Sequence, residues 1–370
     1  MQTPSLIELG MRPFFQQQLS LDELENSHLG RVVEHHKTEV VLLGEQGTVR
    51  FALTPGLEQI CVGDWVVFDE SRILRVLERA SIIKRKAAGS KHEFQLIAAN
   101  IDTVFIVTSL NDDFSLNRIE RYLALVKNAQ IEPVVVLTKA DTCPDVEKHC
   151  QQVQNLDSLL SVIAINALKA EGCDLLTPYC RKGQTLAFMG SSGVGKSTIV
   201  NALLGSDELK TAGIREQDSK GRHTTTFRSI KRLPNGALLM DTPGMRELQL
   251  SDSKQGIERA FEDVELLASS CRFKDCQHQT EPGCAVIKAI EMGSLSTRRL
   301  ENYRKLLAEN EHNNATMAEK RANQRAFSKM VNTVQKQNRS IKRALLLINE
   351  RVHNNAPNLN KLILDTSREA

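Results

Sequence analysis

The sequence contains no long hydrophobic run, no secretory leader and no dense set of cysteines. None of its stretches reaches the roughly 18 consecutive apolar residues that a membrane span requires. Residues 1–22 lack the basic start and apolar core of a signal peptide. We therefore expect a cytoplasmic protein without a membrane partner. Eight cysteines among 370 residues are too few for a disulfide framework, which favours a reducing compartment.

A strong net charge is also missing. The formal charge is +3 at pH 7, so an acidic partner has to be bound by local patches and not by the field of the whole molecule. The length of 370 residues accommodates two or three domains, each with its own hydrophobic core. We expect a modular, monomeric protein.

Residues 190–198 match the phosphate-binding loop pattern G-x-x-x-x-G-K-[ST] at every position. A short apolar strand (184–189) precedes them and helical spacing (197–204) follows, so backbone N–H groups and a helix N-terminus can face an anion. A glycine- and serine-rich connector is the alternative. The predicted phosphate-binding residues are Gly190, Ser191, Ser192, Gly193, Val194, Gly195, Lys196, Ser197 and Thr198. Lys196 can reach the β and γ oxygens as a catalytic cation, and the Ser197 hydroxyl suits Mg²⁺.

A second motif lies upstream, where an apolar strand (133–137) runs into Thr138, Lys139, Ala140 and Asp141. This is the [NT]-K-x-D pattern that reads guanine in GTPases. The Asp141 carboxylate can accept two hydrogen bonds from guanine N1–H and N2–H₂, whereas adenine has no matching donor pair. Thr138 stands where asparagine is more frequent, but it keeps a hydroxyl there. A solvated rim at a strand end is the competing interpretation.

The next strand (161–165) ends at Asn166 and Ala167. GTPases usually place Ser-Ala here to present a backbone N–H to the guanine carbonyl. The position fits this role, and the backbone of Asn166 and Ala167 can serve it. Asparagine in place of serine departs from the pattern, so this assignment stays open.

Two further segments are predicted to hold Mg²⁺ and sense the γ-phosphate. Residues 241–244 read Asp-Thr-Pro-Gly after an apolar strand. Asp241 is expected to hold Mg²⁺ through water, and the Gly244 N–H to contact the γ-phosphate. Residues 221–226 read Gly-Arg-His-Thr-Thr-Thr in the preceding loop. One of these threonines is expected to complete the Mg²⁺ coordination, and Thr225 is our choice among three adjacent candidates.

The residue after the Asp-Thr-Pro-Gly motif is Met245, where many GTPases carry a glutamine that orients the attacking water. Methionine does no acid or base work, so intrinsic hydrolysis should be slow. His223 is the nearby group best able to position or deprotonate a water. A solvent-exposed loop histidine without a catalytic role is the alternative.

The N-terminal third shows a different pattern. After a polar lead with one short helix (20–26), five short apolar runs lie at residues 31–35, 39–43, 48–53, 64–69 and 73–77. They suit a five-stranded barrel of the OB type. Phe51, Trp65 and Phe68 either stack bases or belong to the core. Residues 79–91, which include Lys84, Arg85, Lys86 and Lys91, are predicted to form a linker, either a solvated joint or a phosphate contact.

From residue 101 onward strands alternate with helices, which indicates α/β architecture. A buried strand (102–108) is followed by a helical face formed by Leu116, Ile119, Leu123 and Val126. A later helix (255–268) follows the Asp-Thr-Pro-Gly motif and leads toward a cysteine cluster. This order allows a nucleotide-driven change to pass along that helix.

Cys271, Cys276, His278 and Cys284 form a C-x₄-C-x-H-x₅-C cluster within fourteen residues. Three thiolates and one imidazole suit a closed tetrahedral Zn²⁺ site, and no open coordination position is evident, so we predict one structural zinc. Free reduced thiols are the alternative. Farther on, residues 320–343 contain eight basic residues and no acidic one. This segment either lies on RNA or forms a solvated helix.

The motif order is unusual, because the guanine motif comes before the phosphate loop and the switch loops come last. Together with residues 221–226 and 241–244, the N-terminal β region and the Cys/His cluster, this order resembles the ribosome small-subunit-dependent GTPase A family (RsgA, also YjeQ), from about Gly30 to Leu306. The resemblance implies a circularly permuted GTPase that is slow alone and is stimulated by the small (30S) ribosomal subunit late in that subunit's maturation. It also implies OB and zinc domains that flank the nucleotide site and touch ribosomal RNA, here 16S rRNA.

The predicted domains are a lead (1–28), an OB-type β-barrel (29–80), a basic linker (81–95), a circularly permuted GTPase domain (96–255), a zinc-binding helical domain (256–310) and a polar, basic helical extension (311–370). Two other functions compete with a GTP hydrolase. One is a kinase or ATPase, which Asp141 and the lack of a second substrate motif argue against. The other is an RNA-binding scaffold with a vestigial nucleotide pocket, which the intact Lys196, Ser197 and Asp241 argue against.

Overall fold

The computed structural model describes residues 3–53, 59–86, 94–111, 113–205, 228–241 and 250–315, with scattered positions from 319 to 335. By their contacts, residues 1–314 form one unit and residues 315–370 another. The predicted domain boundaries remain predictions. No helix among the described residues is long and apolar enough to cross a membrane.

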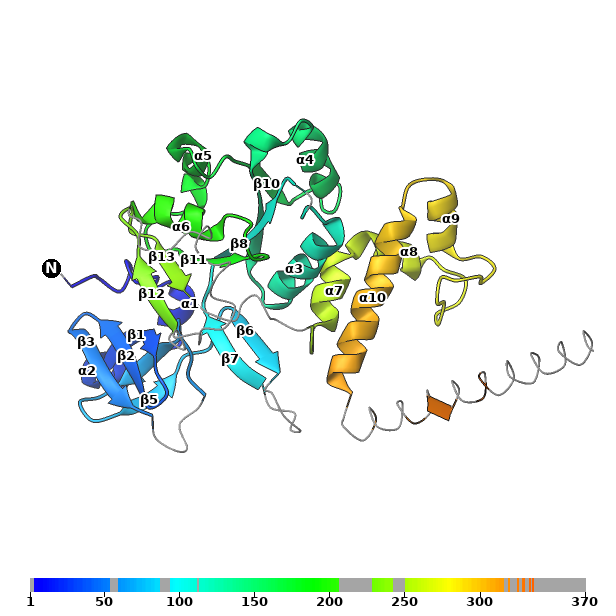
Figure 1. The fold of residues 1–370 in the computed structure, drawn as a ribbon. Helices are drawn as coiled ribbons and strands as arrows, with labels where there is room; N and C mark the ends of the chain where they lie inside the picture. Colours follow the sequence, from blue (N-terminus) through cyan, green and yellow to red (C-terminus); the bar gives the residue numbers. More distant parts are fainter. Residues whose placement is uncertain are drawn as a thin grey trace, which may run out of the picture. The chain divides into compact units, whose positions relative to one another are not determined.

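Five parallel strands form the central part of the main sheet (Figure 1). In spatial order they are β10 (Ser161–Ala164), β9 (Glu132–Thr138), β8 (Thr103–Ser109), β11 (Thr185–Met189) and β13 (Leu238–Asp241). β12 (Arg228–Arg232) pairs with β13 in the antiparallel direction. All seven residues of β8 are buried, as expected of a parallel strand covered on both faces. The α/β prediction is confirmed, and the predicted strands agree with these bounds to within two residues.

The helices associated with this sheet are α3 (Leu116–Asn128), α4 (Val146–Gln154), α5 (Ala170–Asp174) and α6 (Lys196–Leu204), with short 3₁₀ turns at Ala140–Thr142 and Thr177–Tyr179. The predicted apolar face of α3 is buried at Ile119, Leu123 and Val126. These side chains join the largest hydrophobic cluster, which also contains Ile106 and Val135 of the sheet. The core therefore lies between α3 and the strands whose ends carry the predicted motifs.

The N-terminal region contains α1 (Pro13–Gln16), α2 (Leu21–Asn26) and five antiparallel strands. The strands are β1 (His28–His35), β2 (Glu39–Gly44), β3 (Gly47–Ala52), β4 (Trp65–Phe68) and β5 (Ile73–Val76), in the spatial order β3-β2-β1-β4-β5. The five strands are as predicted. No pairing of β3 with β5 occurs among the described residues, so closure into an OB-type barrel stays a prediction.

The aromatic side chains of this region belong to its core. Trp65 is fully buried, and the exposed fractions of Phe68 and Phe51 are 3% and 9%. The Phe51 and Phe68 rings contact each other at 5.5 Å between centroids. Base stacking by these three rings is therefore wrong, because neighbouring apolar side chains already cover them.

The N-terminal lead is packed more firmly than its polar composition indicates. Ser20 caps α2 in a capping box with Glu23. The buried Arg31 donates hydrogen bonds to the carbonyl oxygens of Leu9 (2.6 Å), Gly63 (3.2 Å) and Asn100 (2.8 Å). Burial lowers the pKa of Arg31 to about 10. One side chain thus ties the lead, the β region and the start of the α/β part together.

The predicted basic linker is partly a strand. Residues Ile82–Lys86 form β6, which pairs with β7 (Phe94–Ala99) in a separate two-stranded sheet. Ile83 is buried in the central core. Lys84 forms an ion pair with Asp252 at 2.6 Å, and Lys86 donates to the carbonyl oxygen of Asn313 at 2.5 Å. These two lysines make contacts within the protein, and the interpretation of residues 79–91 as a linker stays a prediction.

The helix predicted over residues 255–268 is two helices, α7 (Lys254–Ala260) and α8 (Glu262–Ser269). They break at Phe261, whose φ and ψ of −122° and 39° are not helical. The Phe261 ring is fully buried, 4.5 Å from the Arg299 guanidinium and 5.4 Å from the Tyr303 ring. Both partners lie on α10 (Thr297–Asn314), which follows α9 (Ala285–Glu291). Packing of Phe261 against α10 accompanies the break.

Candidate nucleotide site

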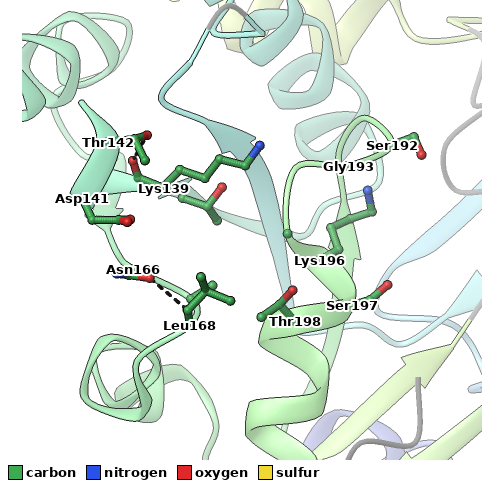
Figure 2. Close-up of a pocket in the computed structure, with 13 residues that line it drawn as sticks. Lys139, Asp141, Thr142, Asn166, Leu168, Ser192, Gly193, Lys196, Ser197 and Thr198 are labelled. Atoms are coloured by element: carbon green, nitrogen blue, oxygen red, sulfur yellow. Dashed lines mark hydrogen bonds between the residues drawn. The ribbon is translucent and has the colours of Figure 1, made fainter. Parts of the chain in front are cut away.

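One pocket of about 280 Å³ lies at the carboxyl ends of β9, β10 and β11 (Figure 2). Residues from all three predicted segments line it, although 24 positions separate each segment from the next in sequence. The lining residues are Thr138, Lys139, Asp141, Thr142, Asn166, Ala167, Leu168, Ser192, Gly193, Gly195, Lys196, Ser197 and Thr198. Figure 2 shows the guanine motif and the phosphate loop on opposite sides of this space, with the Asp141 carboxylate directed into it.

The phosphate loop connects β11 to α6 through backbone conformations that need glycine. Gly190 and Gly195 have φ angles of +149° and +96°, in the region that disfavours a side chain. A Cβ on Gly190 would lie 2.2 Å from the carbonyl oxygen of Val107 in β8. The loop therefore begins in direct contact with the neighbouring strand, and α6 begins at Lys196 with its N-terminus at the pocket.

Lys196 folds over the loop that precedes it. Its Nζ donates to the carbonyl oxygen of Gly190 at 2.9 Å and also to that of Ser191. Ser197, in the first turn of α6, lines the same pocket. A cation and a hydroxyl thus lie at the helix N-terminus, where the backbone dipoles favour an anion.

The two motifs are joined directly by Thr138. Its Oγ1 donates to the carbonyl oxygen of Val194 at 2.6 Å, across 56 residues of sequence. Thr138 is almost completely buried, so this bond is shielded from water and its loss would leave a buried carbonyl unpaired. The threonine hydroxyl thus provides a side-chain link between the guanine motif and the phosphate loop.

The guanine end of the pocket is built from two loops that contact each other. The backbone N–H of Ala140 donates to the carbonyl oxygen of Ile165 at 3.2 Å. Asn166 Oδ1 accepts from the Leu168 N–H at 3.0 Å, which closes a tight turn. Lys139 has a left-handed backbone with φ 59°, and its side chain extends along the pocket in Figure 2.

Sequence reasoning missed Leu168 and Thr142. The Leu168 side chain is 84% exposed, yet it lines the pocket beside Asn166. An exposed apolar side chain at this place offers a surface for the flat face of a base. Its position directly after Asn166 and Ala167 at a strand end was the available signal. Thr142 Oγ1 donates to the carbonyl oxygen of Lys139 at 2.9 Å and thereby stabilises the turn that carries the motif.

The predicted Mg²⁺ ligands are only partly described. Asp241 is the last residue of β13, is exposed, and does not line the pocket. Because β13 is parallel to its neighbour β11, Asp241 lies at the same sheet edge as the start of the phosphate loop. His223, Thr225 and Gly244 lie outside the described residues, as does Met245.

The predicted metal ligands lie together. The ligand atoms of Cys271, Cys276, His278 and Cys284 are all within 4.8 Å of one another. The sulfur atoms of Cys271 and Cys284 are 3.8 Å apart, and His278 Nδ1 lies 3.6 Å and 3.5 Å from them. Sulfur ligands about 2.3 Å from a tetrahedral zinc are separated by roughly 3.8 Å, so the arrangement fits that ion.

The environment of these ligands also suits a metal. Burial, together with the nearby Arg304, lowers the pKa of His278, which favours the neutral imidazole that binds metals. The other five cysteines do not join the cluster: Cys61, Cys173 and Cys180 are buried, and Cys143 and Cys150 are half-buried. Burial raises the pKa of the Cys180 thiol to about 11, as expected of an unreactive core cysteine.

A parallel sheet with the guanine motif before the phosphate loop in sequence, and both in one pocket, defines a circularly permuted nucleotide-binding fold of the GTPase class. The family model "RsgA GTPase" matches residues 76–251. A model for ABC transporters matches residues 174–350, a range that includes the phosphate loop common to many nucleotide-binding families. The chain belongs to the RsgA GTPase family.

Relatives and solved structures support this membership. The chain is 57% identical over 330 residues to "Small ribosomal subunit biogenesis GTPase RsgA 2" of Vibrio parahaemolyticus, covering 89% of this chain and 92% of that protein. It is 50% identical over 256 residues to the RsgA of Xylella fastidiosa, covering 69% and 77%. The crystal structure of YjeQ from Thermotoga maritima matches with a TM-score of 0.59 and 26% identity over 76% of this chain and 98% of that one. YloQ, a circularly permuted GTPase, shares the fold with a TM-score of 0.55 at 21% identity, over 78% and 97%. The resemblance found in the sequence is confirmed.

Proposed function

We propose that this chain hydrolyses GTP, binds the small (30S) ribosomal subunit, assists its late maturation and is stimulated by it. The observation that carries the proposal is the single pocket in which Asp141 and Lys196 face one space. The printed names of the relatives, small ribosomal subunit biogenesis GTPases, support the choice of partner.

In this proposal each end of the pocket binds one end of GTP. Asp141 accepts the N1–H and N2–H₂ hydrogen bonds of guanine, and the backbone of Asn166 and Ala167 meets the guanine carbonyl. Residues 190–198 and Lys196 hold the phosphates of GTP and of the product GDP. Ser197, Thr225 and Asp241 would hold Mg²⁺, which would supply positive charge beside the phosphates. The Gly244 N–H senses the γ-phosphate.

Hydrolysis is proposed to depend on His223, because Met245 replaces the glutamine that orients water in many GTPases. We expect His223→Ala to abolish subunit-stimulated turnover while leaving GTP binding nearly intact, since the histidine would act on the water and not on the nucleotide. Steady-state GTP hydrolysis with isolated small subunits measures the stimulated turnover, and equilibrium GTP binding measures the affinity. Unchanged stimulated turnover in the variant would remove the assignment.

The rest of the chain is proposed to serve subunit binding. Residues 29–80 would form an OB-type barrel, and Cys271, Cys276, His278 and Cys284 would hold one structural Zn²⁺; both modules would touch 16S rRNA. The basic segment 320–343, largely outside the described residues, would lie on RNA. The protein would act as a cytoplasmic monomer. α7 and α8 would carry nucleotide-dependent changes from the switch loops toward the zinc module.

One experiment decides the proposal: GTP turnover by the full chain, measured with and without isolated small ribosomal subunits. We expect slow turnover alone and faster turnover with subunits. No turnover in either case would favour an RNA-binding scaffold. Competition between ATP and GTP for the pocket is the companion measurement, and equal affinity for the two nucleotides would favour a kinase or ATPase.

A further inference from the structure

Arg118, in the first turn of α3, contacts the phosphate loop from outside the nucleotide pocket. Its Nη1 donates to the Ser191 hydroxyl oxygen at 2.9 Å. Ser191 is the second residue of the loop, and neither it nor Arg118 is among the pocket-lining residues. The contact therefore acts on the loop itself, outside the pocket that the described residues line.

The guanidinium of Arg118 is held in place by Asp113. Nη1 lies 2.6 Å from Asp113 Oδ1 and 3.3 Å from the Asp113 carbonyl oxygen. The turn that carries Asp113 is fixed by Asn111, whose Oδ1 accepts from Ser109 Oγ at 2.7 Å and from the Asp113 N–H at 3.2 Å. Ser109 ends β8, so a chain of hydrogen bonds connects this strand, through the turn and Arg118, to the loop.

The Asp113 carboxylate depends on this arginine. Its second oxygen, Oδ2, is buried and has no hydrogen-bond partner among the described residues. Arg118 forms an ion pair with Asp113, and both side chains are about one-third exposed. Without the guanidinium, a partly buried negative charge would stand close to a loop that has to bind an anion.

The contact from Arg118 matters to the phosphate loop because Lys196, the cation within the loop, has to serve both the loop and the phosphates. Lys196 donates hydrogen bonds to the carbonyl oxygens of Gly190 and Ser191. An ammonium has three donors, and bound phosphates would compete for them. The bond from Arg118 goes to the side-chain hydroxyl of Ser191, an acceptor that Lys196 does not use.

We propose that Arg118 is a positioning residue, which holds the phosphate loop in its binding geometry through the hydroxyl of Ser191, while Asp113 holds the guanidinium. The inference rests on the proposed function, because it requires that the loop binds the phosphates of GTP. The inference assigns a role to Arg118 and Asp113, which lie outside the motif, and to Ser191 within it. The second position of the loop, where the pattern allows any residue, carries a specific hydroxyl contact.

The test is equilibrium binding of GTP to the full chain and to a set of single and double variants. Arg118→Gln and Ser191→Ala should each weaken GTP binding by about threefold to tenfold, less than a buried hydrogen bond to a charged group contributes, because the Arg118 side chain is about one-third exposed. The double variant should be no weaker than Arg118→Gln alone, because both changes remove one contact. Ser191→Thr keeps the hydroxyl and should retain most of the affinity, a rescue that a merely space-filling role of Ser191 would not predict.

Two controls separate this role from general effects. Arg121 lies on the same helix and forms an ion pair with Glu309 instead, so Arg121→Gln should bind GTP normally. Adding Asp113→Asn to Arg118→Gln removes the unpaired carboxylate. The loss of GTP affinity that comes from the missing Arg118–Ser191 hydrogen bond should remain in this double variant. Thermal unfolding of each variant, expected to be close to that of the original chain, reports on folding.

The outcomes are distinct. Wild-type affinity of Ser191→Ala, additive losses in the double variant, or full recovery on adding Asp113→Asn would each overturn the positioning role while leaving the proposed function in place. Failure of the unsubstituted chain to bind GTP would overturn the proposed function, and this inference with it.

Discussion

The nucleotide pocket draws its residues from positions 138–198, whereas the Cys/His cluster draws all of its ligands from positions 271–284. In the pocket, distant segments are brought together by the order of parallel strands and then joined by the bond from Thr138 to Val194. In the cluster, a short and mostly irregular segment brings four ligands together without any strand. We therefore expect the site built on the sheet to keep its geometry without a ligand, and the site built on the short loop to depend on an ion for its stability.

The strongest way to test this difference is to remove the metal ligands. Replacing Cys271, Cys276 and Cys284 with serine should abolish zinc binding and greatly lower the thermal unfolding midpoint of the segment, because structural zinc contributes on the order of 10 kcal/mol in small zinc-dependent folds. GTP binding should persist, since the pocket takes no residue from this segment. Zinc content, thermal unfolding and GTP affinity are the measurements.

Cys150→Ser is the matched control for this substitution. Cys150 is half-buried like Cys271 but lies outside the cluster, so its replacement should leave the zinc content unchanged. A zinc-free protein with the original unfolding midpoint would show that the cluster does not need an ion, and the contrast between the two sites would disappear.

The next largest effect is expected at the guanine end of the pocket. Asp141→Asn replaces an acceptor pair with one acceptor and one donor, so guanine loses charge-assisted hydrogen bonds and meets a mismatched N–H group. GTP affinity should fall by about a hundredfold, and ATP affinity should change little. Competition binding with both nucleotides measures the two affinities. Asp145→Asn, at an exposed aspartate four residues further on, serves as the control; an equal loss there would point to a non-specific charge effect.

The smallest effect tests the link between the two ends. Thr138→Val keeps the shape of the side chain but removes the hydroxyl, which leaves the Val194 carbonyl buried and unpaired. We expect about tenfold weaker GTP binding, corresponding to one lost buried hydrogen bond. Thr138→Ser, which keeps the hydroxyl, should bind nearly as well as the original chain. Equal binding by the valine and serine variants would mean that the sheet alone aligns the two motifs.

The sequence predicted the motif-bearing elements well because their signals are local. The buried strands are continuous apolar runs such as Val134–Leu137 in β9, and both β9 and β11 run into a recognisable motif. The cysteine cluster is equally local, since four ligands within fourteen residues can meet at one ion whatever the rest of the fold does.

Features that depend on contacts between distant segments were not predictable. The break at Phe261 accompanies packing against α10, and β6 exists because β7 pairs with it. The lead, for which the sequence predicted only one short helix, is held by the buried Arg31 through the carbonyl oxygen of Leu9, and the same side chain also binds the carbonyl oxygen of Asn100. Backbone acceptors carry no side-chain signal, so no pattern of residue types shows them.

By itself, the sequence predicted the kind of ligand at each site. Residue types at fixed spacing decide whether a phosphate, a guanine or a metal ion is bound, because that chemistry belongs to the side chains and to the glycine-dependent backbone. Only the tertiary structure decided that Asp141 and Lys196 share one space, that Leu168 lines it and that Arg118 contacts the phosphate loop. Those facts follow from which strands are neighbours in the sheet, and strand order results from the packing of the whole core.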